Sequence, residues 1–352
     1  MIKLAHEITT IIIDEYGHSI FLQRLSDPYW FQALGCVLGY DWHSSGVTTV
    51  LTGVLKNALN PEEHGLAVCG GKGKASLQAP LEISQVGEKF GFSTNRIERL
   101  RYASRMSAKV DNTAIQAGFP LYHHAFVVAE DDKWAVIQQG MNVKDRTARR
   151  YHWLSEHVQN FVLEPHDAIV GNIKREIALN MTDKQSQNCQ KISTDIAKEK
   201  PKKILRQLQS IRPAHQTSLK KWMPEAEWKE YVVDVLYLPN NLNWKALKTA
   251  YEFQPKNYEE LLGIKGIGPA TVRGLALISE LIYGEPPSWK DPVKYSFAYG
   301  GKDGVPYPVN RKAMDQSIQI LENAIQNAKI ERKEKLRSLQ RLRRYVPSDH
   351  SS

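Results

Sequence analysis

The chain of 352 residues has only three cysteines, Cys36, Cys69 and Cys189, which lie far apart in the sequence. They form no Cys-x-x-Cys pair, so neither a disulfide framework nor a four-cysteine zinc or iron–sulfur site can be built from them. This usage is typical of a reducing compartment, and we expect a cytoplasmic or nucleoid-associated protein. Every apolar run is shorter than the roughly 20 residues that span a bilayer, so we expect no membrane partner.

Positive charge, in contrast, is present in excess. The chain has 47 Lys and Arg against 38 Asp and Glu, a formal net charge of +9. Such an excess favours a polyanionic partner, with nucleic acid before a membrane surface. Hydrophobic residues make up 42% of the chain, as in an ordinary globular protein. The length is sufficient for about two domains.

The pattern of residues predicts an α+β fold that is mainly helical. Residues 94–110 are expected to form a helix with a basic face, and 65–71 a short buried strand. The segments LYHHAFVVAE and KWAVIQQGM are predicted strands joined by a tight turn at Asp131-Asp132. Pairing residue 130 with 133 places His124 opposite Gln139 and His123 opposite Gly140. The following segment, 147–162, is predicted to be helical.

Composition shifts divide the chain into four parts. Residues 1–180 are expected to form an α+β domain with a small sheet that carries any catalytic site. Residues 181–225 are polar and poor in aromatic residues, and we interpret them as an exposed helical linker. Residues 226–330 are predicted to be a compact helical domain, and 331–352 a basic C-terminal tail.

The most informative stretch is EELLGIKGIGPATVRGLALISELIYG, residues 259–284. It predicts a short helix capped by Asn257, a Gly-Ile-Gly turn, and a second helix that begins at Pro269. Glycines allow turn conformations closed to other residues, and the N-terminus of the second helix presents free N–H groups to a phosphate. The pattern resembles the helix-hairpin-helix motif, which binds DNA without reading its sequence. The alternative is a plain helical hairpin.

This interpretation names a set of DNA-binding residues. Those in the hairpin are Gly263, Lys265, Gly266, Ile267, Gly268, Thr271 and Arg273, and the basic residues expected to assist them are Arg105, Arg149 and Arg150.

Polar clusters in the N-terminal part suggest phosphodiester chemistry. In an extended segment, Asp41 and His43 would point the same way and could share a metal ion. The segment GGKGKAS supplies Lys72 and Lys74, although it does not fit the phosphate-binding P-loop pattern. Of the two strand histidines we prefer His124, because the predicted register places it opposite Gln139.

The resulting hypothesis is a metal-dependent nuclease of DNA repair or processing. Asp41, His43 and His124 would line one pocket with Lys72 and Lys74 at its rim, and Asp41 and His43 would hold Mg²⁺ or Mn²⁺. Two alternatives stay open. One is a DNA-binding protein without catalysis, in which the polar groups are only hydrogen-bonded core residues. The other is a glycosylase-like enzyme that uses Asp291, shortly after the second helix.

Long segments also carry a family resemblance: RLSDPYWFQALGCVLGYDWHSSGVTTVLTGVLK, YASRMSAKVDNTA, LYHHAFVV, WAVIQQGMN, RRYHWLSE and ELIYGEPPSWKDPVKYSFAYGGKDGVPYPV. They are similar to domain-of-unknown-function family 763, over residues from about 7 to 330. The resemblance implies one unit shared by archaea and some bacteria, with the hairpin built in and no established activity. Members often begin with an extra segment, so we expect that an N-terminal part is missing or that the start differs.

Overall fold

The computed structural model describes residues 1–40, 45–211, 238–239, 241–297 and 311–345. Asp41 and His43, the expected metal ligands, lie outside the described residues. The helices are α1 (Ile2–Ser26), α2 (Pro28–Val37), α3 (Val47–Ala58), α4 (Pro61–His64), α5 (Ala79–Lys89), α6 (Thr94–Lys109), α7 (Gln187–Ala197), α8 (Pro201–Ser210), α11 (Trp244–Phe253), α12 (Tyr258–Gly263), α13 (Pro269–Tyr283), α14 (Arg311–Asn327) and α15 (Arg332–Tyr345), with the shorter turns η1 (Gly73–Gln78), η2 (Val110–Ala114) and η3 (Lys184–Ser186).

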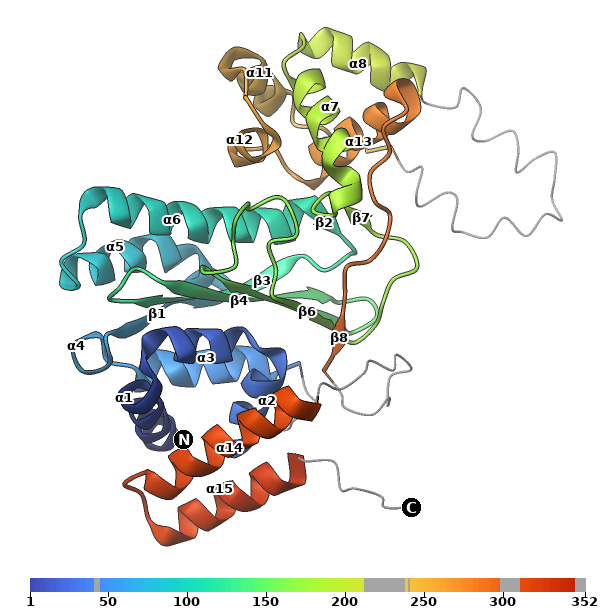
Figure 1. Ribbon diagram of the computed structural model, residues 1–352. Coiled ribbons are helices and arrows are strands. Elements are labelled where there is room, and N and C mark those ends of the chain that lie inside the picture. The colour runs from blue at the N-terminus through green and yellow to red at the C-terminus, as the bar shows by residue number, and fades with distance from the viewer. Residues whose placement is uncertain (41–44, 212–237, 240, 298–310, 346–352) are drawn as a thin grey trace, which may run out of the picture.

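A six-stranded sheet in the order β1-β3-β4-β5-β6-β8 lies at the centre of the molecule (Figure 1). Its strands are β1 (Leu66–Lys72), β3 (Leu121–Ala129), β4 (Trp134–Asn142), β5 (Thr147–Leu154), β6 (Ala168–Gly171) and β8 (Tyr295–Ser296). All neighbours are antiparallel except β6 and β8. Helices α5 and α6 cover one face, and α1, α2 and α3 cover the other (Figure 1). The expected mainly helical α+β class is confirmed.

Five further helices, α7, α8, α11, α12 and α13, form a helical unit beyond α6 (Figure 1). The segment predicted as an exposed helical linker supplies α7 and α8, so its described part is helical as expected, but one side of each helix is buried. Cys189, Ile196 and Ala197 of α7 and Ile204 of α8 are buried. They recur at helical spacing, and this narrow apolar stripe is enough to bury one side of each helix although the segment is polar overall.

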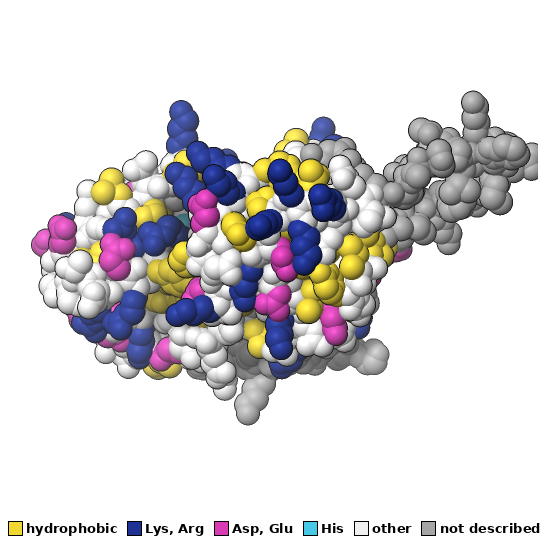
Figure 2. Space-filling view, turned by 90° about the horizontal axis from the view of Figure 1, so that it is seen from above, with side chains coloured by type: hydrophobic (Ala, Val, Ile, Leu, Met, Phe, Trp, Pro, Cys, Tyr) yellow, Lys and Arg dark blue, Asp and Glu magenta, His cyan; other side chains and the backbone are white. Residues whose placement is uncertain are grey.

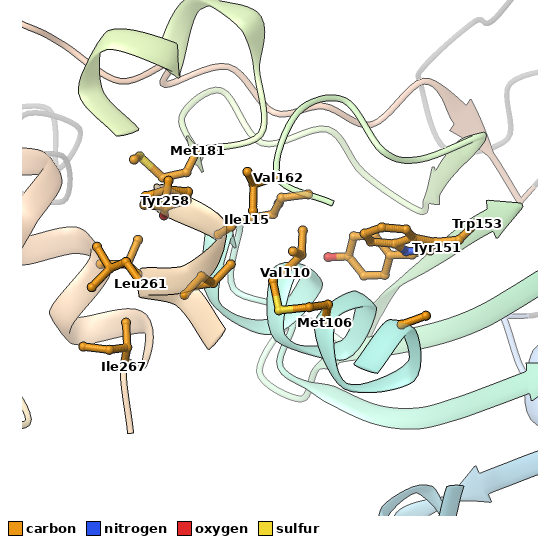
Figure 3. Close-up of a cluster of buried hydrophobic side chains, with 14 of the residues drawn as sticks. Met106, Val110, Ile115, Tyr151, Trp153, Val162, Met181, Tyr258, Leu261 and Ile267 are labelled. Atoms are coloured by element: carbon orange, nitrogen blue, oxygen red, sulfur yellow. The ribbon is translucent and has the colours of Figure 1, made fainter. Parts of the chain in front are cut away.

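One continuous core joins the helical unit to the sheet. Figure 3 shows side chains of α6 and η2, such as Met106 and Val110, leading on to Tyr258, Leu261 and Ile267 of the α12–α13 hairpin. A second core packs the other face of the sheet against α1, α2 and α3 and includes Leu321 of α14 and Leu342 of α15. The segment predicted as a basic tail is therefore largely a packed helix, and Arg341 of α15 donates a hydrogen bond to the Val37 carbonyl at 3.2 Å.

Two local predictions in the sheet are wrong. Residues 147–154 form strand β5, not a helix, because their side chains alternate between the faces: Tyr151 and Trp153 pack in one core while His152 points the other way, toward Leu25. The β3–β4 register is also shifted by one residue. The Ala129 N–H donates to the Lys133 carbonyl at 2.9 Å, so the loop contains three residues, not two. His123 therefore pairs with Gln139, and His124 with Gln138.

A buried ion pair fastens the segment after α13 to the sheet. Arg149 of β5 donates to Asp291 at 2.6 Å, and both side chains are 0% exposed. Asp291 also accepts hydrogen bonds from the backbone N–H groups of Arg175 and Val293. Two residues after Val293, Tyr295 opens β8 and pairs with Val170 of β6.

We predict that Asp291→Asn lowers the free energy of unfolding by about 3–5 kcal/mol, because it leaves the Arg149 charge buried without a counter-charge. Asp195→Asn is the matched control, since Asp195 pairs with Lys198 on an exposed helix surface, where an ion pair contributes less than about 1 kcal/mol. Urea unfolding followed by circular dichroism measures both. Equal effects of the two substitutions would contradict the role given to this pair.

Candidate functional site

The turn between α12 and α13, residues 263–268, is here called the glycine turn. Asn257 caps α12 by accepting a hydrogen bond from the Glu260 N–H, as expected, and the Glu260 carboxylate accepts from the Lys256 N–H. Ile267 is buried and anchors the turn, whereas Lys265 is exposed. The turn is thus held from inside and presents its backbone and one lysine to solvent.

The two central glycines serve different purposes. Gly266 has φ +92°, and a Cβ atom there would lie 2.7 Å from Nδ2 of Asn243, so this position requires glycine. Gly268 is the N-cap of α13 with φ −116°, a conformation open to any residue. Around it the nearest atom to an added Cβ would be the Gly266 carbonyl oxygen at 4.0 Å. Among the residues that the structure describes, no side chain caps this 15-residue helix, so its N-terminus is open beside the turn.

Three contacts hold the hairpin against the end of α6. Lys109 Nζ donates at 3.4 Å to the carbonyl of Ile264, the second residue of the turn. Gln116, just after η2, donates to the Pro269 carbonyl at 2.9 Å. Tyr102 of α6 donates to the Glu259 carboxylate at 2.6 Å. The glycine turn therefore has a defined position relative to α6.

A basic pocket of about 380 Å³ lies at this end of α6. Its walls come from η1, α5, α6, η2 and β3: Ser76, Leu77, Pro80, Ser104, Arg105, Ala108, Lys109, Asn112, Thr113, Leu121, Tyr122, His123 and His124. The pocket brings together Arg105 and His124, which were predicted separately as a DNA contact and a catalytic residue. Lys109 joins it to the glycine turn.

The exposed face of α6 adds positive charge beside the pocket. Arg96 and Arg99 share Asp132 as a partner, and Arg101 pairs with Glu98. Arg105 is exposed and forms no ion pair with any residue in the described part of the chain. Figure 2, which views the molecule from the side of the helical unit, shows many Lys and Arg side chains on this face. The surface is thus suited to an anionic ligand.

His124 belongs to a buried chain of hydrogen bonds. Asp111 accepts from the Gln138 amide at 2.6 Å and from Trp153 Nε1 at 3.0 Å, and lies 2.5 Å from His166 Nε2. Because the Gln138 amide nitrogen faces Asp111, its oxygen faces His124 Nδ1, 2.9 Å away. Nδ1 therefore carries the proton, and Nε2 accepts from the Ser104 hydroxyl at 2.9 Å.

This arrangement leaves both nitrogens of His124 occupied. Burial lowers the pKa of His124 to about 4, so that the ring is neutral near pH 7. Burial likewise raises the pKa of Asp111. Each of these buried polar side chains has a hydrogen-bond partner within the network. The immediate role of the network is to hold the pocket wall in place. Gln138 orients the His124 ring, and not Gln139 as expected, because the predicted register was shifted by one residue.

His123 points to the opposite face of the sheet and has a nitrogen to spare. Its Nε2 lies 3.0 Å from the Thr52 hydroxyl, which itself donates to the Thr48 carbonyl at 2.9 Å. The proton is therefore on Nε2, and Nδ1 is buried with no hydrogen-bond partner in the described part of the chain. Burial, with the charge of Lys72 contributing, lowers the pKa of His123 to about 4. His123 pairs with Lys72 across β1 and β3.

Arg149 and Arg150 do not contribute to the surface, which corrects the prediction that they bind DNA. Both side chains are essentially fully buried. Arg150 donates to Gln32 at 3.1 Å and to His152 at 2.7 Å, and its guanidinium lies over the Phe31 ring. Both arginines belong to strand β5, which was predicted to be a helix and which carries them into the interior.

The GGKGKAS segment is only partly as expected. Lys72 and Lys74 are exposed. The Gly70 N–H donates to the Glu82 carboxylate at 2.7 Å, so it is not available to bind an anion. A Cβ at Gly70 would lie 2.3 Å from the His124 carbonyl oxygen, so this glycine allows β1 to approach β3.

Asp291 lies in the buried pair with Arg149 rather than in an open pocket beside the glycine turn. This burial argues against the glycosylase-like alternative, because a catalytic Asp291 would have to be accessible to the bound base. Ser104, Trp153 and His166, which complete the network around His124, were missed by the sequence reasoning. Ser104 and Ser107 on the buried face of α6 were the available signal, since small polar residues there need partners.

Comparison with known proteins gives one match. The family model DUF763, described as a protein of unknown function, matches residues 1–309. The chain belongs to this family. No curated protein and no solved structure matches this DUF763 chain. In the described part of the chain, no helix combines the length and the apolar character needed to cross a bilayer.

The lowered pKa values of His123 and His124 on β3 predict a loss of stability in mild acid. The unfolded chain binds a proton at each near pH 6.5, whereas the folded protein does so only near pH 4. Their contribution to the free energy of unfolding is therefore fully present above about pH 6.5. It falls as the pH drops toward 4, by roughly 3 kcal/mol per histidine over the whole window. Urea unfolding of the native protein and of His124→Gln at several pH values tests this. The variant should show the shallower decline, and parallel curves would refute the assignment.

Proposed function

We propose that this DUF763 protein binds nucleic-acid backbone, duplex DNA first, with the α12–α13 hairpin acting as a helix-hairpin-helix motif. The observation that carries the proposal is the position of the uncapped N-terminus of α13. The helix begins directly after the glycine turn, and Lys109 holds this turn beside the basic pocket and the basic face of α6.

The chemistry of this surface fits a phosphodiester chain. Free N–H groups and the positive end of the helix dipole favour a phosphate at the start of α13. Lys265 on the turn and Arg105 at the pocket offer cations for neighbouring phosphates. None of these groups is arranged to read bases, so binding should tolerate any sequence and weaken steeply with salt. Such sequence-independent binding to the phosphate backbone is consistent with a role in DNA repair or processing.

A second candidate function is metal-assisted hydrolysis of the bound strand. The observation in its favour is the unpartnered, unprotonated Nδ1 of His123, near Lys72. Such a nitrogen is suited to bind a metal ion or to accept a proton from water. His123 replaces His124 in this hypothesis. Asp41 and His43, which would complete a site for Mg²⁺ or Mn²⁺, lie outside the described residues. Ser45, which follows them, accepts a hydrogen bond from Gln139, the residue paired with His123.

The binding proposal is tested by two substitutions of equal shape at Gly268. Gly268→Asp and Gly268→Asn both fit the open N-cap, and both side chains are favoured there, so each should preserve or raise stability. The aspartate places a negative charge where the phosphate would lie. We expect Gly268→Asp to weaken binding to a fluorescent duplex at least about tenfold more than Gly268→Asn, a difference of about 1.4 kcal/mol. Equal affinities, with normal circular dichroism, would remove the hairpin from the interface.

The hydrolysis proposal needs a separate assay. End-labelled single- and double-stranded DNA is incubated with the protein and Mg²⁺, Mn²⁺ or a chelator. We expect cleavage that depends on the metal and is lost in His123→Ala and in the Asp41→Ala/His43→Ala double variant, while duplex binding persists. Absence of cleavage under every condition would leave binding without catalysis as the function.

A further inference from the structure

A second group of polar side chains lies where α1 meets α4, against the other face of the sheet from the hairpin (Figure 1). It consists of His6 from α1 and Glu63 and His64 from α4. One ligand atom from each residue lies within 4.8 Å of the others, and among the described residues no other set of three His, Cys, Asp or Glu side chains meets this condition.

The backbone holds the two α4 residues in place. Asn60 caps α4 and Pro61 is its first residue, which fixes the start of the short helix. Gly65 ends it with φ +59°, and a Cβ there would lie 2.8 Å from His18 and Glu130 side-chain atoms. His18 in turn donates to the His64 carbonyl at 2.8 Å. Glu63 and His64 therefore leave the helix in fixed directions.

The donor atoms have the chemistry of a zinc site, and one pair of them already has the separation of two ligands on one ion. His6 Nε2 lies 3.1 Å from Glu63 Oε2, near the roughly 3.3 Å between two ligands on a tetrahedral ion with bonds of about 2.0–2.1 Å. Two imidazoles and a carboxylate match a borderline divalent cation. The His64 side chain is buried, and its Nδ1 accepts a hydrogen bond from the Asn60 N–H at 2.9 Å, so the ring is neutral as a ligand must be.

We infer that His6, Glu63 and His64 form a binding site for a divalent cation of the Zn²⁺ class, with the fourth position left to water. The half-exposed His6 and the exposed Glu63 leave the site open to solvent on one side. The ion would tie the N-terminal helix to the segment that leads into β1. This inference is independent of the proposed nucleic-acid binding.

Binding shifts one proton within the His64 ring. Without the ion, Nδ1 accepts from the Asn60 N–H at 2.9 Å, and Nε2 faces the Thr10 hydroxyl at 3.0 Å. That hydroxyl donates to the His6 carbonyl at 2.8 Å, so the ring proton is on Nε2. A cation at Nε2 would leave the ring proton on Nδ1, which would then give up the hydrogen bond from the Asn60 N–H and donate to the Asn60 carbonyl, 3.3 Å away. A backbone carbonyl is a usual second partner for a metal-bound histidine.

The test compares two glutamates on the same short helix. The native chain, freed of any affinity tag, is titrated with Co²⁺ and followed by its visible absorption, and with Zn²⁺ in a calorimeter. We expect one ion per chain at this site, with the absorption of a four-coordinate Co²⁺. Glu63→Gln and His6→Ala should weaken Zn²⁺ binding at least about 10–100-fold, since loss of an outer partner alone costs that much. Glu62→Gln, an exposed neighbour, should leave it unchanged.

Both ligand substitutions are at solvent-accessible side chains, so circular dichroism should confirm an intact fold. Absence of a four-coordinate Co²⁺ spectrum in the native protein would overturn the inference. Binding that survives in Glu63→Gln and His6→Ala would also overturn it, because the ion would then lie elsewhere.

Discussion

The buried pair of Arg149 and Asp291 is the interaction on which the arrangement of the two halves depends. An ion pair with both side chains fully buried is costly to desolvate, and it survives because Asp291 also accepts two backbone N–H groups. Arg149 belongs to a central strand, whereas Asp291 follows the last helix of the helical unit. The pair fixes the point at which the chain leaves the hairpin and returns to the sheet to form β8.

With that return path fixed, the glycine turn has little freedom to move. Tyr102 of α6 contacts α12, Lys109 contacts the turn and Gln116 contacts the start of α13. The core between α6 and the hairpin is continuous (Figure 3). A helix N-terminus on a mobile arm would bind a phosphate weakly, because binding would have to order the arm first. Here the proposed phosphate site, Arg105 and the pocket are preorganised on one face. This rigidity supports a shared ligand for the hairpin and the pocket.

Elements with a strong local signal were predicted well from the sequence. The basic helix α6, strand β1, the Asn257 cap and the glycine turn between two helices are all present. Strand β5 was missed because its two arginines and His152 are polar yet buried, each held by partners distant in the sequence such as Gln32, Leu25 and Asp291. Periodicity cannot reveal such partners.

Part of the candidate site depended on details that no local pattern encodes. The choice of His124 rested on a two-residue turn. Because the loop has one more residue, Gln139 lies opposite His123, and His124 lies opposite Gln138. Which histidine keeps a free nitrogen depends on Thr52 and Ser104, from helices on opposite faces of the sheet. The cation site at His6 was missed for the same reason, because its ligands are 57 residues apart.

The most direct test of the account is hydrogen exchange, measured by mass spectrometry with and without a saturating DNA duplex. If the backbone of the glycine turn and the start of α13 bind a phosphate, their amides should exchange more slowly in the complex, together with the exposed face of α6. Residues around His6 on the opposite side should be unaffected. Protection that is absent from residues 263–273, or that appears only on α14 and α15, would contradict the proposed interface.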